Sequence, residues 1–161
     1  RVVECAKATN ARLLMLQGVP GSGKTTVAKA LKEKNKSVVI VSVDDEFMTP
    51  QGYKFDLSRL REVHETTQEK VRNALSRGSI VIVDNCNAKK AHALPYLNML
   101  KKDENVVILH LRARNRAEAL YFGERSIHNV PENSVVNIYE AIERIESSIV
   151  KVHYISYPQK L

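Results

Sequence analysis

The chain has 161 residues, of which 43% are hydrophobic and 27% are charged. These fractions are typical of globular proteins, and no apolar run approaches the roughly 20 residues that a membrane-spanning helix needs. The formal net charge of +7 is consistent with solubility alone or with a polyanionic partner such as a nucleic acid. Two cysteines, Cys5 and Cys86, do not make a disulfide framework, so we expect a reducing compartment, cytoplasm or nucleus.

The length predicts a single domain over residues 1–161. Because the sequence begins at Arg1 rather than at Met, we expect an excised or trimmed domain. We expect it to act as a monomer or as part of a larger multidomain protein. Residues 1–10 carry little periodic signal and are expected to form a short tail, and the N-terminal stretch does not have the composition of a signal peptide.

Residues 18–26 contain the complete pattern G-x-x-x-x-G-K-T of a phosphate-binding P-loop. An apolar run at 12–17, predicted to be a buried strand, precedes them, and a run of helical composition at 27–34 follows. Glycines let consecutive backbone N–H groups face an anion, and the helix N-terminus adds its positive dipole end. We expect Lys24 to reach the β- and γ-phosphates of a nucleoside triphosphate. The full predicted phosphate site is Gly21, Ser22, Gly23, Lys24, Thr25 and Thr26.

A β-branched run at 37–43 predicts a second buried strand, which ends at two acids, Asp44 and Asp45. A phosphotransferase needs a base near the acceptor hydroxyl, so we favour Asp44 as the general base and Asp45 as a structural or orienting residue. The alternative is that the pair only caps a loop. A loop without regular structure is expected at 46–56, because it holds a proline and a glycine, and a long helix at 57–76.

The strand predicted at 79–83 ends at Asp84. An aspartate after a β-branched strand is typical of the Walker-B position, where it would hold Mg²⁺, through a water, opposite the Thr25 hydroxyl. The alternative is an aspartate that caps a turn after the strand. A helix is then expected at 89–103, with a late start or a kink at Pro95.

A fourth strand is predicted at 106–111 and a short arginine-bearing helix at 116–126. An arginine that closes over the phosphates stabilises the charge of the transferring group. The region offers four candidates, Arg112, Arg114, Arg116 and Arg125. For each of the first three we favour solvent exposure without a catalytic role. The five histidines are scattered, and we assign them to core or surface positions rather than to a ligand set.

After Pro131, a last helix is expected at 132–149 and a short edge strand at 152–157. The helix should face inward with Val135, Ile138, Ile142, Ile145 and Ile149. Alternating strands and helices predict an α/β fold of three layers, with a mostly parallel central sheet and the arginine-bearing helix as a small lid. Ligands bind at the carboxyl ends of strands in such sheets, so the P-loop, Asp44 and Asp84 should share one crevice.

Taken together, these segments resemble the P-loop 5′-hydroxyl polynucleotide kinases related to the phage enzyme. Within that family the chain is most similar to the kinase-like domain of certain animal ubiquitin-ligase-binding proteins. The resemblance spans residues 12–145 and rests on the segments 18–25, 42–45, 52–56, 64–65, 82–87 and 125–131. It implies one P-loop NTPase/kinase domain with Asp44 as general base, Arg125 as the lid arginine near the phosphates, and Asp84 and Asn87 in the segment after the Walker-B strand.

The chain departs from the family at two places. Phe47 stands where the phage enzyme has an acceptor-binding arginine, three residues after the base, and Cys86 stands where the family has threonine in Asp-Asn-Thr-Asn. Phe47 could either stack on a nucleobase, a contact that tolerates any sequence, or anchor the loop in the core.

The resemblance implies transfer of the γ-phosphate of ATP or another NTP such as GTP, with Mg²⁺, to the 5′-hydroxyl of RNA or DNA, as in nucleic acid repair or RNA processing. Acceptor contacts are expected at Asp45, Phe47, Tyr53, Lys54, Asn87, Lys89 and Lys90. Two alternatives stay open. One is a P-loop kinase for a small-molecule hydroxyl, and the other is a non-catalytic NTP-binding module, against which the intact Lys24, Asp44 and Arg125 argue.

Overall fold

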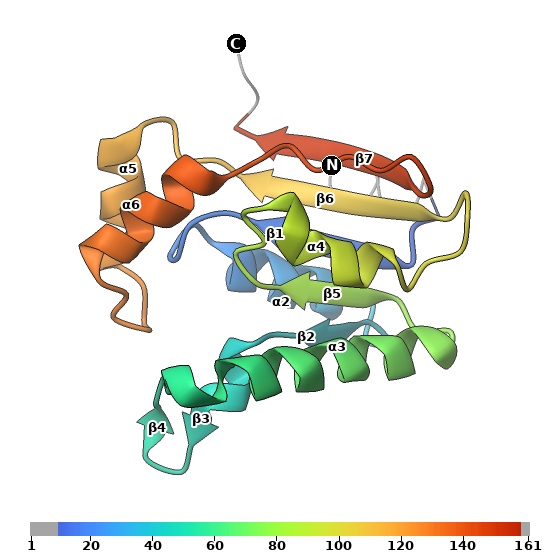
Figure 1. Ribbon diagram of the computed structural model, residues 1–161, viewed down its shortest axis with the longest axis horizontal. Helices are drawn as coiled ribbons and strands as arrows, with labels where there is room; N and C mark the ends of the chain where they lie inside the picture. Colours follow the sequence, from blue (N-terminus) through green and yellow to red (C-terminus); the bar gives the residue numbers. More distant parts are fainter. Residues whose placement is uncertain (1–9, 159–161) are drawn as a thin grey trace.

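The computed structural model describes residues 10–158, whose central element is a five-stranded sheet. Its strands are β1 (Leu13–Gln17), β2 (Val39–Val41), β5 (Val81–Asp84), β6 (Asn105–Leu111) and β7 (Lys151–Tyr157). They lie in the order β2-β5-β1-β6-β7 (Figure 1), and every neighbouring pair is parallel. The α/β fold is therefore confirmed, and β7 is the predicted edge strand. The expected tail at 1–10 lies, apart from Asn10, outside the described residues.

Helices cover both faces of the sheet because alternate side chains of the central strand β1 are buried on opposite sides. Leu13 and Met15 pack with residues of α3 (Leu60–Ser76) and α4 (Lys90–Leu97). Leu14 and Leu16 pack on the other face, where α2 (Lys24–Lys34) contributes Ala28. Figure 1 shows α4 in front of the sheet and α2 behind it. No helix over residues 10–158 has both the length and the apolar character needed to cross a bilayer.

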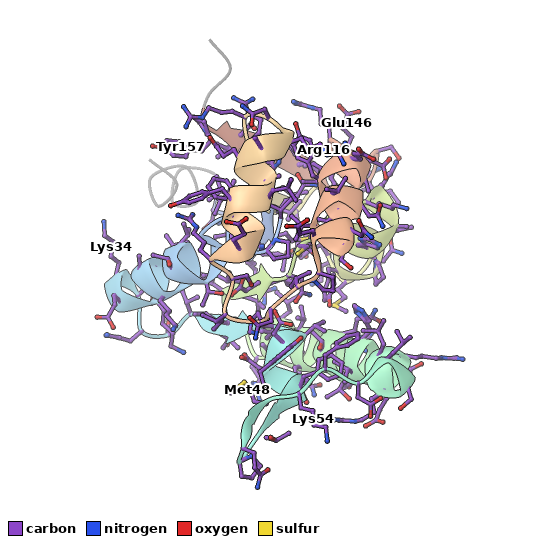
Figure 2. All side chains as sticks on the ribbon, turned by 90° about the vertical axis from the view of Figure 1, so that its left-hand side faces the viewer. Lys34, Met48, Lys54, Arg116, Glu146 and Tyr157 are labelled. Atoms are coloured by element: carbon purple, nitrogen blue, oxygen red, sulfur yellow. The ribbon has the colours of Figure 1, made fainter. Side chains whose placement is uncertain are left out.

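Two short helices, α5 (Arg116–Glu124) and α6 (Glu132–Ala141), form the lid. Val19, Ala113, Ala119 and Val135 form a small core between the lid and the end of the sheet. A Cβ on Gly123 would lie 2.6 Å from Val135 Cγ2, so the two helices touch at a glycine. Figure 2 shows them side by side at the end of the molecule that faces the viewer.

The last helix is shorter than predicted, because α6 ends at Ala141 rather than at 149. The next backbone groups bind to other segments: Glu143 N–H donates to Ala88 O at 2.8 Å, and Glu143 O accepts from Gln17 Nε2 at 2.9 Å. Ile145 is fully buried in the sheet core, as predicted, whereas Ile149 is 58% exposed. Tertiary hydrogen bonds therefore end a helix that the isoleucine spacing alone would continue. The helix expected at 89–103 likewise ends early, at Leu97, although Leu100 is still buried in the core.

The segment expected to be an irregular loop has regular structure. A 3₁₀ helix, η1 (Asp44–Phe47), leads into an antiparallel pair, β3 (Met48–Thr49) and β4 (Gly52–Tyr53). Pro50 lies in the turn between the two strands, and Gly52, the first residue of β4, has a φ of 109°, in the left-handed region that favours glycine. The proline and the glycine in this segment therefore shape a hairpin. A second 3₁₀ helix, η2 (Leu57–Arg59), then opens α3. The hairpin projects beside the carboxyl ends of the strands, below the lid in Figure 2.

Candidate active site

The loop between β1 and α2 has the conformation that the P-loop motif predicts. Gly21 and Gly23 have φ of 77° and 99°, values that favour glycine. The side chain of Lys24 is buried, and its Nζ donates to the carbonyl oxygens of Gly18 at 3.0 Å and Val19 at 2.9 Å. Ser22 Oγ is buried without a hydrogen-bond partner among residues 10–158. A phosphate oxygen in the loop could complete that hydrogen bond, so the loop fits an anionic ligand.

Thr25 and Asp84 meet beside the loop, where Thr25 Oγ1 donates to Asp84 Oδ2 at 2.8 Å. Asp84 is 6% exposed. Burial raises the pKa of its carboxyl, while the Thr25 hydrogen bond and the Lys24 charge oppose the shift. Mg²⁺ binds few protein oxygens and fills its shell with water and phosphate oxygens, which fits this pair. No cluster of three or more His, Cys, Asp or Glu able to hold a metal occurs in the described part of the chain.

Asp84→Asn is expected to stabilise the nucleotide-free protein at neutral pH. Burial raises the pKa of Asp84 above its ordinary value of 3.8, so the ionised carboxylate costs folding free energy above that raised pKa. Urea unfolding at pH 7 should give a higher unfolding free energy for the variant. The gain should shrink as the pH falls through the raised pKa and disappear below pH 3.8, where the wild-type carboxyl is protonated in both the folded and the unfolded state. A variant less stable than wild type at pH 7 would contradict this account.

Asp44 is the first residue of η1, just after β2, and it has one partner from β4 and one from the loop between α5 and α6. Tyr53 OH donates to Asp44 Oδ1 at 3.1 Å, and His128 Nε2 lies 3.3 Å from Oδ2. The Asp44 side chain is still 46% exposed. Burial and the Asp44 charge raise the pKa of Tyr53 to about 12, so the phenol is a hydrogen-bond donor at neutral pH. His128 is not among the site residues predicted from the sequence, although it lies in the segment 125–131 that carries part of the resemblance to the kinases.

Arg125 lies between the lid and the P-loop. Its Nε donates to Gly21 O at 2.7 Å, and its guanidinium lies 4.6 Å from the centre of the Phe122 ring. Arg112 and Arg114 also line the cleft described next, but Arg116 does not. Arg114 is paired with Glu118 at 2.7 Å.

One continuous cleft of about 1620 Å³ joins these groups. It brings together the P-loop, Asp44 and Asp84, which the sequence placed at strand ends of one crevice. Pockets for a single small ligand usually measure about 300–1,000 Å³, so the cleft has room for a nucleotide and a second substrate. Side chains that line it around the P-loop and the lid include Lys24, Thr25, Asp44, Tyr53, Asp84, Cys86, Arg125 and His128. Lys29, Arg112, Arg114 and Tyr157 also line it.

Two predicted acceptor contacts need correction. Phe47 is 1% exposed, and its ring packs 5.1 Å from the ring of Phe55, so it anchors the loop and is not available to stack on a base. Asn87 is buried: its side-chain Nδ2 donates to Leu16 O at 2.6 Å, and its backbone carbonyl oxygen accepts from Gln17 Nε2 at 3.0 Å. Asn87 therefore ties the end of β5 to β1, and its amide is already used within the fold.

The remaining acceptor candidates lie in two places. Tyr53 lines the cleft on the Asp44 side, whereas Asp45, Lys54, Lys89 and Lys90 are exposed and are not among the cleft-lining residues. Contact between these four residues and an acceptor stays a prediction. Only an acceptor that extends beyond the cleft could reach them.

Phe47→Ala is expected to lower the unfolding free energy by about 3–5 kcal/mol, because it empties a buried aromatic site. Urea unfolding followed by circular dichroism measures the change, with Met48→Ala as an exposed neighbour that should cost much less. If Phe47 stacked on a base, the variant would instead bind the acceptor more weakly and keep the stability of the wild type. That result would contradict the assignment of Phe47 as an anchor of the loop.

A comparison with protein families decides the class. The family model described as "AAA domain" matches residues 13–132. This chain belongs to that family. Human NEDD4-binding protein 2 is 31% identical to this AAA domain over 151 residues, which is 92% of the chain but 8% of that protein. The chain thus spans about a twelfth of the length of this curated relative. The resemblance inferred from the sequence is confirmed.

Solved structures show the same fold. A sugar kinase from Janibacter sp. HTCC2649 has a TM-score of 0.64 at 18% identity, covering 93% of this AAA domain and 87% of that chain. A chain of the Pnkp1/Rnl/Hen1 RNA repair complex has a TM-score of 0.64 at 20% identity, and the match covers 81% of this AAA domain and 43% of that chain. This AAA domain therefore has a P-loop kinase fold, and its P-loop makes it a nucleotide-binding domain.

Proposed function

We propose that this AAA domain transfers the γ-phosphate of ATP or another NTP to the 5′-hydroxyl of a polynucleotide. The observation that carries the proposal is the position of Asp44, a partly exposed carboxylate in the same cleft as the P-loop. It is distinct from the buried carboxylate of Asp84 beside Thr25. A kinase needs such a second carboxylate to accept the proton of an acceptor hydroxyl.

In the proposed reaction, Asp44 takes the proton of the acceptor hydroxyl as its oxygen attacks the γ-phosphorus. The P-loop N–H groups and Lys24 hold the phosphates, and Arg125 stabilises the charge on the transferring group. Thr25 and Asp84 would hold Mg²⁺, Asp84 through a water, and the ion would neutralise phosphate charge. Most of the rate enhancement then comes from positioning and charge neutralisation.

Three observations favour a polynucleotide acceptor. The net charge is +7, and Lys29, Arg112 and Arg114 line the cleft, as expected for a protein that neutralises phosphates. The cleft is larger than one small ligand requires. A chain of similar fold occurs in an RNA repair complex. A reaction of this kind would belong to nucleic acid repair or RNA processing.

A small-molecule hydroxyl is the second candidate acceptor, because the similarity to a sugar kinase covers nearly the whole chain. Salt dependence separates the two. The KM for an oligonucleotide should rise steeply with salt as counterion release is lost, whereas the KM for a neutral sugar or nucleoside should change little.

The test is a transfer screen with γ-labelled ATP, GTP, CTP and UTP against 5′-hydroxyl RNA, 5′-hydroxyl DNA, nucleosides and sugars. We expect label at the 5′ end of an oligonucleotide, and the same oligonucleotide with a 5′-phosphate is the matched control that should not be labelled. Tight NTP binding without transfer to any acceptor would contradict the proposal and favour a non-catalytic binding module.

A further inference from the structure

The lid carries a histidine to the proposed base. His128 lies in the loop between α5 and α6, and its Nε2 is 3.3 Å from Asp44 Oδ2. We infer that His128 is a positioning residue for Asp44, which it holds in the orientation needed to accept a proton. This inference rests on the proposed function, since it gives His128 a role that acts through the base and not on the substrate.

The surroundings of His128 fix which ring nitrogen carries the proton. Its ring packs against the Tyr53 ring with the centroids 4.3 Å apart and the planes tilted by 42°, and its backbone N–H donates to Ser126 Oγ at 3.3 Å. Ring Nδ1 is buried and has no hydrogen-bond partner within residues 10–158. A proton on Nδ1 would be buried without an acceptor, which is costly. The neutral ring therefore carries its proton on Nε2, where it donates to Asp44.

The same short segment also contacts the P-loop. Three residues before His128, Arg125 Nε donates to Gly21 O at 2.7 Å. The lid approaches so closely here that a Cβ on Gly21 would lie 1.8 Å from Phe122 O. Arg125 thus contacts the P-loop and His128 contacts Asp44 in the same position of the lid. The lid position that covers the P-loop is therefore also the one in which His128 reaches Asp44.

Both donors leave the carboxylate able to act as a base. A carboxylate has about four lone-pair sites, and Tyr53 and His128 occupy one on each oxygen of Asp44. When phosphate is transferred, the acceptor O–H bond breaks and its proton passes to a free site on Asp44. The acceptor oxygen bonds to the γ-phosphorus, whose bond to the β–γ bridging oxygen breaks to release NDP. His128 keeps its own proton throughout.

Two substitutions at one position test the role. His128→Leu removes the donor, whereas His128→Gln keeps an N–H at similar reach. We expect the leucine variant to lower kcat about 10- to 100-fold, the size of a lost hydrogen bond to a charged group, with little change in the KM for NTP. The glutamine variant should recover most of the loss. His64→Leu, at an exposed histidine of α3 outside the cleft lining, is the matched control and should keep wild-type kcat.

A purely structural lid residue would give a different pattern. The leucine variant would then raise the KM for NTP and lower the melting temperature, and glutamine would not restore kcat. That pattern would overturn the inference. If the His128→Leu variant kept full turnover while the Asp44→Asn variant was inactive, the positioning role of His128 would also be overturned. The proposed function would stay intact. Full turnover of Asp44→Asn would instead overturn the proposed base itself.

The ring nitrogens of His128 give a readout that needs no turnover. In long-range ¹H–¹⁵N spectra we expect the neutral His128 ring to be protonated at Nε2. Asp44→Ala should weaken this preference, because it removes the acceptor that favours it. A wild-type ring protonated at Nδ1 would overturn the positioning role, whatever the kinetics show.

Discussion

Arg125→Ala is expected to lower kcat for phosphoryl transfer by about 10³–10⁵-fold, the range for an arginine that stabilises the transferring group. In the structure its Nε is bound to Gly21 O and its guanidinium packs on Phe122. These contacts place the remaining guanidinium N–H groups beside the P-loop, where the phosphates would lie. Because the interaction is strongest in the transition state, nucleotide affinity should change much less than kcat.

Single-turnover transfer of labelled phosphate measures this loss, and titration with a fluorescent nucleotide measures affinity. Arg116→Ala is the matched control, since Arg116 is an exposed arginine at the start of α5 that does not line the cleft. Arg125→Lys keeps the charge without the planar guanidinium and should recover only part of the rate. Near-wild-type kcat in Arg125→Ala would show that the lid arginine has no role in transfer.

Asp44→Asn is expected to lower kcat by about 10²–10⁴-fold, the usual worth of a general base. The amide oxygen can still accept the hydrogen bond from Tyr53 OH, which lies 3.1 Å from Oδ1 in the wild type, so the loop should keep its fold. The amide NH2 group then faces His128 Nε2, so the variant also loses the hydrogen bond from His128. What the variant loses is the lone pair basic enough to take the acceptor proton. Nucleotide binding should be unchanged, because Asp44 lies on the acceptor side of the cleft.

Glu46→Gln is the matched control for Asp44→Asn. Glu46 is an acid of the same 3₁₀ helix, but it pairs with Lys70 and does not line the cleft. Its loss should leave kcat unchanged. Equal losses of kcat in the two variants would mean that η1 acts through its overall charge or its fold. Asp44 would then not be the base.

The sequence by itself determined the nucleotide side of the site. The P-loop is made of consecutive residues, so its pattern encodes the loop, its glycine conformations and the helix start together. Asp44 and Asp84 could also be placed, because residues that directly follow parallel strands must come to the same edge of the sheet. Four of the five sheet strands were visible for a related reason, since buried parallel strands are continuous apolar runs. The fifth, β7, is a partly exposed edge strand of mixed composition.

Only the tertiary structure decided the acceptor side. Whether Phe47 stacks on a base or anchors a loop depends on Phe55, which packs against its ring. The end of α6 depends on Gln17 and Ala88, which bind the backbone of Glu143. The meeting of Tyr53 and His128 on Asp44 needs a hairpin, a lid and a strand end to converge. The contacts of Glu143 and of His128 join segments far apart in the chain, whereas Phe55 and Tyr53 reach their partners through the fold of the hairpin. Local periodicity carries no information about which of these groups will meet.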